Sequence, residues 1–196
     1  MWDWIGENKV VNLFQFDTQV GLQAVKRIKP HSLVELATAN SIMRLMVSEQ
    51  GAEQPIDTYI RYKNDISQWY SCMRDQYHLT EDEIHTVESY LLPVYGVGDT
   101  QEIVMEISMD DHISGFNVTQ SNKLRKGIAK KDEKLQEAMK KMFFEHGKEI
   151  GTSENLLNYI WKEVIGKQLG LNTAQVKPCE RMQKRCPYFL RANGGR

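Results

Sequence analysis

The residues best suited to chemistry in this chain are a group of cations: Lys123, Arg125, Lys126, Lys130 and Lys131. In a helix, residues 123, 126 and 130 share one face, because side chains three and four positions apart are neighbours there. Like charges at that spacing repel, so the grouping costs some stability unless an anion binds nearby. The alternative interpretation is a solvated helix face whose charges pair with Glu102, Glu106 or the acidic stretch at 49–110.

Other catalytic chemistries lack the residues that they need. The five histidines show no metal-ligand spacing with a second histidine or a cysteine. The sequence has no nucleophile elbow, no phosphate-binding glycine loop that ends in Lys-Ser/Thr and no dinucleotide fingerprint. Glu81-Asp82-Glu83 is placed where a helix N-terminus favours acids, and Asp110-Asp111 lies at a helix end or in a loop. We therefore predict no catalytic residue and no metal site in this chain.

Length and composition fit a globular protein of one ordinary domain or two small ones. The chain has 196 residues, of which 41% are hydrophobic and 26% charged, and its formal net charge is −1. That balance argues against nucleic-acid binding by bulk charge, but it does not exclude a local basic patch. No apolar run approaches the roughly 18 residues of a membrane span, and we expect no signal peptide. Three cysteines favour a reducing compartment, and we expect a cytoplasmic location.

Helix signals run through most of the chain. A capping-box spacing, in which Glu follows a Ser, Thr or Asp three residues later, occurs at three places: Ser32 with Glu35, Thr80 with Glu83, and Asp99 with Glu102. Periodicity and helix stops predict helices over about 18–29, 33–47, 56–63, 66–76, 80–92, 118–131, 132–149 and 153–169. Asp17 or Thr18 can cap the first of these helices, and Pro30 stops it. The predicted fold is mainly α, a compact multi-helix domain with at most a short N-terminal strand at 10–16. The predicted core includes four aromatic residues: Trp69, Phe143, Phe144 and Trp161.

A series of short motifs follows in order along residues 10–170. They are Leu13-Phe14-Gln15-Phe16-Asp17-Thr18, Gly21-Leu22, Lys29-Pro30, Ser32-Leu33-Val34-Glu35-Leu36-Ala37 with Arg44, Tyr95-Gly96-Val97, Gln101-Glu102-Ile103-Val104-Met105, Ser114-Gly115-Phe116, Leu124-Arg125-Lys126-Gly127-Ile128-Ala129-Lys130-Lys131, and Phe143 with Gly147. Each motif is weak alone. Their order and spacing together resemble the bacterial replicative DNA polymerase III alpha subunit, a family C DNA polymerase.

The resemblance implies the first part of a mostly helical fingers domain, which closes over the incoming nucleotide and the templating base. It implies that the triphosphate is bound by Arg125, Lys126, Lys130, Lys131 and Lys123, through charge-assisted hydrogen bonds to phosphate oxygens. Gln101 and Glu102 either orient the basic helix from a neighbouring helix or are simply exposed, and Arg44 is a further supporting residue. The implied partners are a DNA primer-template and a deoxynucleoside triphosphate, in DNA replication by a DNA-directed DNA polymerase, a nucleotidyltransferase.

Three departures from the family pattern limit this interpretation. The family's catalytic aspartates lie in the palm, upstream of the Phe-Gln motif, and this chain starts too late to include them. We therefore expect the chain to be inactive alone, and Mg²⁺ to bind only with a complementing palm, supplied by a separately encoded polymerase subunit. Arg44-Leu45-Met46 stands where the family has Arg-Pro-Gly. Gly170-Leu171-Asn172-Thr173-Ala174-Gln175 lacks the His of the family's Phe-Asn-x-Ser-His element.

We divide the chain into a fingers-like helical domain at 1–171 and a basic tail at 172–196, which we expect to be disordered or loosely packed. The tail is interpreted either as extraneous sequence, such as readthrough, or as an evolved basic arm. An alternative function is a non-catalytic interaction or regulatory protein, derived from a fingers module, that binds DNA or a polymerase partner. A third is an unrelated helical DNA-binding domain, which the acidic stretch at 49–110 disfavours.

Overall fold

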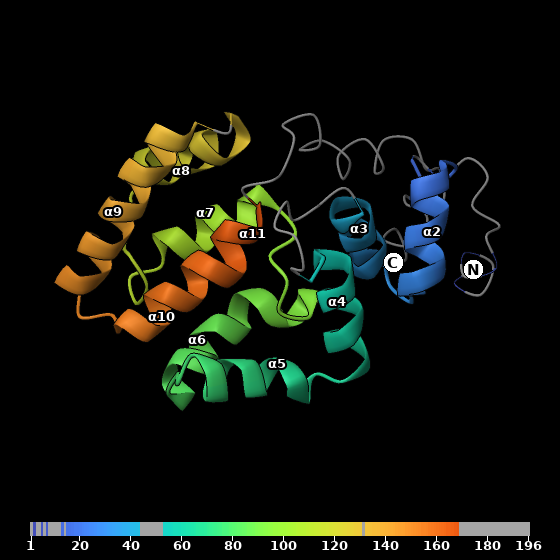
Figure 1. Ribbon diagram of the computed structural model, residues 1–196, viewed down its shortest axis with the longest axis horizontal. Coiled ribbons are helices and arrows are strands. Elements are labelled where there is room, and N and C mark those ends of the chain that lie inside the picture. The colour runs from blue at the N-terminus through green and yellow to red at the C-terminus, as the bar shows by residue number, and fades with distance from the viewer. Residues whose placement is uncertain are drawn as a thin grey trace, which may run out of the picture. The chain divides into compact units, whose positions relative to one another are not determined.

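A computed structural model describes residues 15–43, 53–130 and 132–168, together with Trp2, Ile5, Glu7 and Leu13. These residues form two compact units, one with helices α2 and α3 and one with helices α4 to α11 (Figure 1). All regular structure in the described residues is helical, which confirms the mainly α prediction. Most of the predicted strand at 10–16 lies outside the described residues, and residues 15–17 form a turn. The predicted tail at 172–196 also lies outside them, so the division at 171/172 stays a prediction.

In the described part of the first unit, a short turn joins α2 (Gln19–Ile28) to α3 (Leu33–Ile42). The Thr18 hydroxyl caps α2 by accepting a hydrogen bond from the Gly21 N–H at 3.1 Å. α2 ends where Lys29 adopts a left-handed conformation with φ 48°, directly before Pro30. Of the two predicted caps, Asp17 and Thr18, the structure uses the hydroxyl, and the predicted stop at Pro30 is confirmed.

The second unit carries the candidate site. Its elements are α4 (Pro55–Asn64), α5 (Ser67–Ser71), the π-helical turn η1 (Cys72–Gln76), α6 (Glu81–Leu91), the 3-10 turn η2 (Leu92–Val94), α7 (Gln101–Met109), α8 (Val118–Lys130), α9 (Glu133–Glu149), α10 (Glu154–Tyr159), the π-helical turn η3 (Ile160–Ile165) and α11 (Gly166–Gln168). α10, η3 and α11 follow one another without a break. The six helices predicted between residues 56 and 169 therefore recur in this unit, with bounds that differ by a few residues.

The capping predictions for the second unit have different outcomes. Thr80 and Glu83 form the predicted capping box, in which the Thr80 N–H donates to the Glu83 carboxylate at 2.8 Å and the Glu83 N–H donates to the Thr80 hydroxyl. The prediction that Asp99 caps the next helix is wrong. Asp99 is buried, and α7 starts one residue later, with the Thr100 hydroxyl accepting from the Ile103 N–H at 3.4 Å.

Two segments far apart in the sequence meet in a cluster of buried and half-buried polar and aromatic side chains, here called the inner polar cluster: Trp69, Tyr77, Tyr159, Glu163 and Lys167. The Trp69 indole N–H donates to the Tyr159 hydroxyl at 2.8 Å, and the Tyr77 hydroxyl donates to the Glu163 carboxylate at 2.6 Å. The Lys167 ammonium lies 2.7 Å from the same carboxylate. Polar groups removed from water are favourable only when they are paired, so these bonds hold α5 against α10 and the residue after η1 against η3.

Gly96 lets the chain turn tightly against this cluster. Its φ is 73°, and a Cβ added there would lie 2.5 Å from the Trp69 indole nitrogen. Only glycine fits both the left-handed backbone and the close approach to the ring. The Tyr95-Gly96-Val97 motif thus contains a tight turn that packs against the Trp69 ring.

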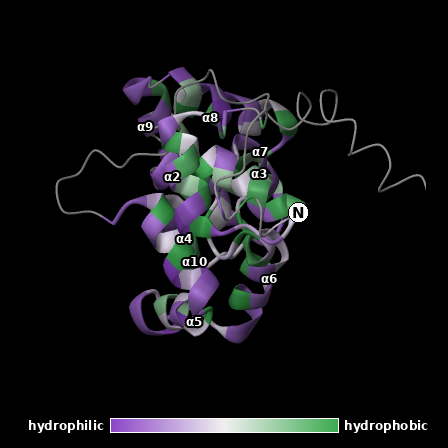
Figure 2. Cartoon of the chain, turned by 90° about the vertical axis from the view of Figure 1, so that its right-hand side faces the viewer, coloured by the Kyte–Doolittle hydropathy of each residue, from purple (hydrophilic) through white to green (hydrophobic). Residues whose placement is uncertain are grey.

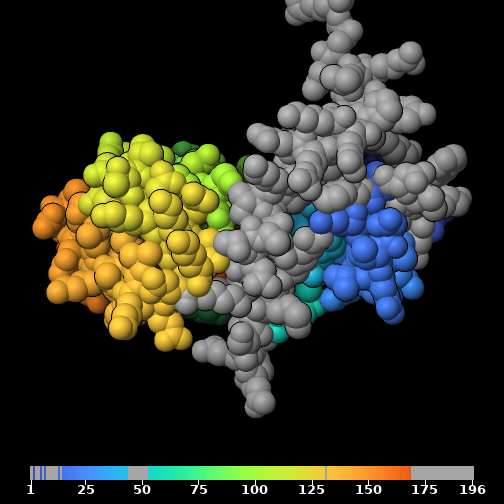
Figure 3. All heavy atoms as spheres, turned by 90° about the horizontal axis from the view of Figure 1, so that it is seen from above, coloured from blue at the N-terminus to red at the C-terminus, as the bar shows by residue number. Residues whose placement is uncertain are grey.

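Helices α7, α8 and α9 follow one another through short connections, and α8 lies between α7 and α9 in the contacts of this unit. In Figure 1, α8 and α9 lie next to each other, and Figure 2 shows that α9 carries mainly hydrophilic residues. Figure 3 looks directly onto the side chains of these two helices. The α8–α9 pair thus presents a polar surface.

Candidate functional site

The basic helix α8 begins with a reciprocal cap. The Gln120 N–H donates to the Asn117 side-chain carbonyl at 3.0 Å, and the Asn117 N–H donates to the Gln120 side-chain carbonyl at 2.9 Å. This is the geometry of a capping box made from amide side chains, and it satisfies two backbone donors that the helix leaves open. The start of α8 is therefore well defined by its own sequence, through an Asn-x-x-Gln spacing that our sequence reasoning missed.

A buried pair of serines attaches α8 to α7. The Ser108 and Ser121 hydroxyl oxygens are 2.9 Å apart, and neither residue is exposed. Ser121 also donates to the Met105 backbone carbonyl at 3.1 Å, and Ser108 donates to the same carbonyl at 2.9 Å. Because Ser108 lies near the end of α7 and Ser121 near the start of α8, the contact joins these two helix ends.

The other end of α8 is held by α9. A Cβ added at Gly127 would lie 3.3 Å from the Leu135 side chain, so the two helices approach closely there. The Gln136 amide donates to the Gly127 carbonyl at 3.0 Å. Leu124 and Ile128 complete the buried face of α8. The helix is thus fixed in rotation, which determines where its cations point.

The exposed face of α8 carries the cations that the sequence predicted to share it. Lys123, Lys126 and Lys130 are all exposed, and we call them the cation row. Within the described residues, none of the three forms an ion pair with an acidic side chain. Neither Glu102 nor Glu106, the pairing partners that we considered, reaches them. The described structure thus leaves the like charges of the row without internal compensation.

Arg125 does not belong to the cation row. It is two residues from Lys123, which is about 200° around the helix axis, so the two side chains leave α8 in different directions. Arg125 is half-buried, and its guanidinium makes one long hydrogen bond, 3.4 Å, to the side chain of Asn122. A guanidinium held so weakly is available to a ligand that approaches from that side.

The supporting residues lie at the start of α7. Gln101 is buried, 3% exposed, and its side-chain carbonyl has no hydrogen-bond partner, whereas Glu102 is exposed. Among the described contacts, neither residue bonds to a cation of α8. Gln168, which our sequence reasoning missed, donates to the carbonyls of Gly98 and Thr100 at 2.9 and 2.6 Å and so anchors the approach to α7. Lys131 and Arg44 lie outside the described residues.

The four predicted core aromatics divide into two groups. Trp69, Phe143 and Trp161 are buried, as predicted. Phe144 is only half-buried, and the prediction that it belongs to the core is wrong. Residues 143 and 144 are about 100° apart around α9, and Phe143 occupies the inward direction against Phe116 and Trp161. Phe144 is left at the edge of the core.

Comparison with known proteins decides the family. The sequence model described as "Bacterial DNA polymerase III alpha subunit finger domain" matches residues 1–151. The chain belongs to this family. It is 48% identical over 170 residues to the "Probable DNA polymerase YorL" of Bacillus subtilis (strain 168), and equally to a "DNA-directed DNA polymerase" of Bacillus phage SPbeta. Over 158 residues it is 27% identical to the "DNA polymerase III subunit alpha" of Aquifex aeolicus (strain VF5).

The extent of these matches confirms the resemblance seen in the motifs and also limits it. The alignments cover 87% of this chain for the first two relatives and 81% for the third. The chain spans only 13% of the length of the first two relatives and 12% of the third. Family membership therefore extends to a fingers-domain segment of a polymerase, and the activity of the whole enzyme belongs to a proposal.

Two further properties of the described residues bear on the site. No group of three or more His, Cys, Asp or Glu side chains in them is arranged to hold a metal ion. No helix among them is both long and apolar enough to cross a membrane.

Proposed function

We propose that this chain acts as part of the fingers of a DNA polymerase III alpha-type enzyme, where α8 binds the phosphates of the incoming deoxynucleoside triphosphate. The supporting observation is that the cation row stands on a helix anchored from two sides yet has no described acidic partner. Anchoring removes much of the entropy cost of aligning cations with a ligand. The repulsion between the like charges of the row is relieved when a polyanion binds to them. Both features suit a preformed phosphate-binding surface.

The division of labour follows from the side chains. Lys126 and Lys130 lie one turn apart on α8, so they act as two point charges along a phosphate chain. Arg125 leaves the helix in another direction, and its planar guanidinium binds a second set of phosphate oxygens in a bidentate manner. The charge that develops on the leaving pyrophosphate is stabilised by such cations during phosphoryl transfer.

The remaining parts of a polymerase lie elsewhere in this proposal. The described residues do not fit a magnesium site, because they contain no suitable cluster of oxygen ligands. We infer that a palm, contributed by another part of the enzyme or by a separately encoded subunit, supplies the catalytic aspartates and positions the DNA primer-template. The isolated chain is then inactive in DNA synthesis. Its proposed place of action is the cytoplasm, where replication enzymes of this family meet DNA.

The test is an NMR titration of the full chain with dATP, with and without Mg²⁺. We expect shifts centred on α8, and roughly tenfold weaker binding in a Lys126→Ala/Lys130→Ala variant, which corresponds to about 1.4 kcal/mol. A separate Arg125→Ala variant shows whether the second direction of approach is used. Lys162→Ala, an exposed lysine on η3, is the matched control and leaves the affinity unchanged.

Two results would contradict the proposal. If shifts on α8 are absent at millimolar dATP, or if the double variant binds as tightly as the control, α8 is not a triphosphate-binding surface. The interaction or regulatory role would then be the better interpretation, and capture of a polymerase palm by the full chain would be the measurement to make next.

A further inference from the structure

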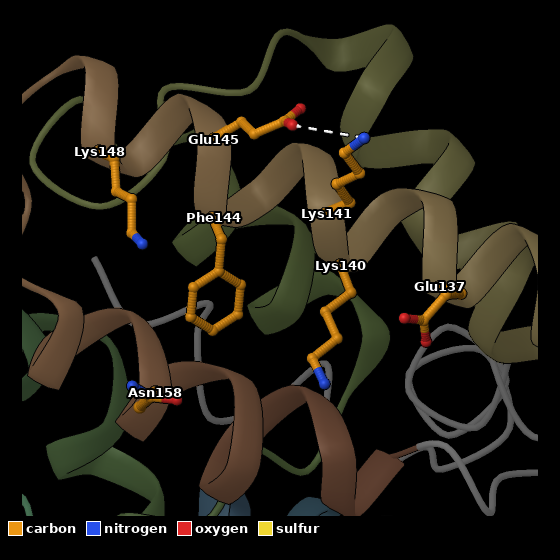
Figure 4. A pocket seen from close by; sticks show the side chains of 7 residues that line it. All are labelled: Glu137, Lys140, Lys141, Phe144, Glu145, Lys148 and Asn158. Atoms are coloured by element: carbon orange, nitrogen blue, oxygen red, sulfur yellow. Dashed lines mark ion pairs between the residues drawn. The ribbon is translucent and has the colours of Figure 1, made fainter.

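The surface between α9 and α10 holds a shallow groove that the proposed function does not use. It is lined by charged side chains of α9, by Phe144 and by one residue of α10: Glu137, Lys140, Lys141, Phe144, Glu145, Lys148 and Asn158 (Figure 4). We propose that this groove binds single-stranded nucleic acid, with a base stacked on Phe144 and backbone phosphates on Lys140 and Lys148. The proposal goes beyond the triphosphate contact of α8 and stands independently of it.

Phe144 supplies the stacking surface. Its ring lies beside Phe143 and Trp161, with centroid distances of 5.9 and 6.3 Å, and it is left half-buried at the groove. Phe143 fills the core, whereas Phe144 packs only partly against its neighbours and keeps part of its surface at the groove. A partly exposed aromatic ring offers its face to any base, and such stacking does not depend on the sequence of the strand.

Two ammonium groups flank this ring. Lys140 and Lys148 are four residues before and after Phe144, which places them about 6 Å to either side along the helix. Figure 4 shows both side chains and the ring directed to the same side of α9. Lys140 has no ion pair among the described residues, and Lys148 meets Glu154 at 3.7 Å between largely exposed side chains. Exposed pairs of that length contribute little, so phosphates can displace them.

One of the two glutamates that line the groove is turned away from the ring, and the other lies at the end of the groove. Glu145 pairs with Lys141 at 3.8 Å, and Figure 4 shows both on the opposite side of α9 from the ring. Glu137 lies at one end of the groove, beyond Lys140. On α10, the Asn158 amide nitrogen donates to the Glu154 carbonyl at 2.8 Å, which leaves its side-chain oxygen able to accept a hydrogen bond from a base. Between Lys140 and Lys148, the side of α9 that carries the ring is therefore cationic and aromatic.

The alternation of cation, ring and cation favours a nucleic-acid strand over other anions. A triphosphate needs cations grouped around one centre, whereas here a ring separates them by roughly 12 Å along the helix. An acidic peptide would use the lysines but would leave the ring face without a partner. A single strand presents bases and phosphates side by side, and the open shape of the groove accepts a chain that enters and leaves.

The test is fluorescence anisotropy of labelled oligothymidylate with the full chain at low salt. We expect Phe144→Leu, which keeps an apolar side chain against Trp161, to weaken binding at least about fivefold, and Phe144→Trp to preserve it. Lys140→Ala/Lys148→Ala weakens binding and lowers the slope of log affinity against log salt by about 1.4. Lys141→Ala, on the other side of the same helix, changes the affinity less than twofold. Far-UV circular dichroism confirms that each variant is folded.

Several outcomes would overturn the inference. These are the absence of oligothymidylate binding by the wild-type chain, equal affinities for Phe144→Leu and wild type, or equal losses from Lys141→Ala and Lys140→Ala/Lys148→Ala. Displacement of the oligonucleotide by polyglutamate at the same charge concentration would point to an acidic-peptide site instead. Because any binding by the basic tail at 172–196 is common to all variants, differences between variants report on the groove.

The two proposals can fail separately. Phe144→Leu leaves the dATP shifts on α8 unchanged, and Lys126→Ala/Lys130→Ala leaves oligothymidylate binding within twofold. If dATP fails to bind while the oligonucleotide depends on Phe144, the triphosphate proposal falls and the groove stands. If dATP binds to α8 while oligothymidylate binding does not depend on Phe144, the groove proposal falls and the triphosphate proposal stands.

Discussion

The polar and charged groups of the inner polar cluster are paired with one another, whereas the lysines of the cation row have no described acidic partner. In the cluster, the Trp69 indole, the Tyr77 hydroxyl and the Glu163 carboxylate each have a partner within 2.8 Å. In the row, three exposed lysines stand on a firmly held helix and meet no described acid. Pairing inside the fold serves stability, because an unpaired buried group is costly. Cations left without such pairing cost stability, and they leave charge available to a ligand.

The largest loss of stability should come from a substitution at Gly96, which packs against the inner polar cluster. Gly96→Ala introduces a Cβ 2.5 Å from the Trp69 indole nitrogen and forces alanine into a backbone with φ 73°. We expect the free energy of unfolding to fall by about 3 kcal/mol, from steric overlap and left-handed strain together. Urea denaturation measures it. Gly151→Ala is the control, because its φ of 89° brings strain alone, with no atom within 4 Å, and a loss of about 1 kcal/mol. Equal losses would contradict the packing argument.

A smaller effect should follow from removing one hydroxyl of the cluster. Tyr77→Phe deletes the hydrogen bond to Glu163, whose carboxylate keeps Lys167, and should cost about 1.5 kcal/mol at neutral pH. Burial and the adjacent carboxylate raise the pKa of Tyr77 above its ordinary value of 10.0. The folded state therefore holds the phenolic proton more tightly than the unfolded state does. That stability is present below pH 10 and is lost as the pH rises further.

Urea denaturation across the alkaline range tests this pH dependence. We expect the fall in the free energy of unfolding above pH 10 to be smaller in Tyr77→Phe than in the wild type. Other tyrosines contribute to the same fall in both proteins, so the difference between the two curves isolates Tyr77. Parallel curves would show that the hydroxyl does not titrate differently in the folded state.

The smallest effect should be a gain in the free energy of unfolding when one lysine of the cation row is removed. Lys126→Ala relieves repulsion from Lys123 and Lys130, whereas Lys141→Ala removes an attractive pair with Glu145 on α9. Both exchanges gain the same helix propensity, so the difference between them reports the charges alone. We expect Lys126→Ala to be more stable than Lys141→Ala by about 0.5 kcal/mol at low salt. The difference should vanish in high salt, and its persistence there would rule out an electrostatic cause.

Local signals predicted the helices well because the residues that start and stop a helix are neighbours in the sequence. Thr80 with Glu83 shows this directly, as does the stop at Pro30. Asp99 shows the limit: its side chain is drawn into the interior, so the adjacent Thr100 caps α7 instead. The π-helical turns η1 and η3 also escaped prediction, because their residues follow a periodicity that an α-helical pattern does not reveal.

The sequence predicted which residues make up the candidate site, but not the directions in which all of their side chains point. Spacing alone placed residues 123, 126 and 130 on one face, and the structure confirms that face as exposed. Whether Arg125 would join them depended on the rotation of α8, which the buried Ser108–Ser121 contact and the approach at Gly127 determine. Phe144 was assigned to the core because two adjacent aromatics look alike in a sequence, and only packing shows which one turns inward.

The hydrogen bond between Trp69 and Tyr159 joins residues 90 positions apart, whereas α7, α8 and α9 meet through neighbouring segments of chain. Closing a long loop costs entropy before its contacts can form. Contacts between adjacent helices therefore form first during folding. We therefore expect the three-helix segment to assemble early and the Trp69–Tyr159 bond to form after the main barrier. Loss of that bond should then quicken unfolding while refolding keeps nearly its original rate.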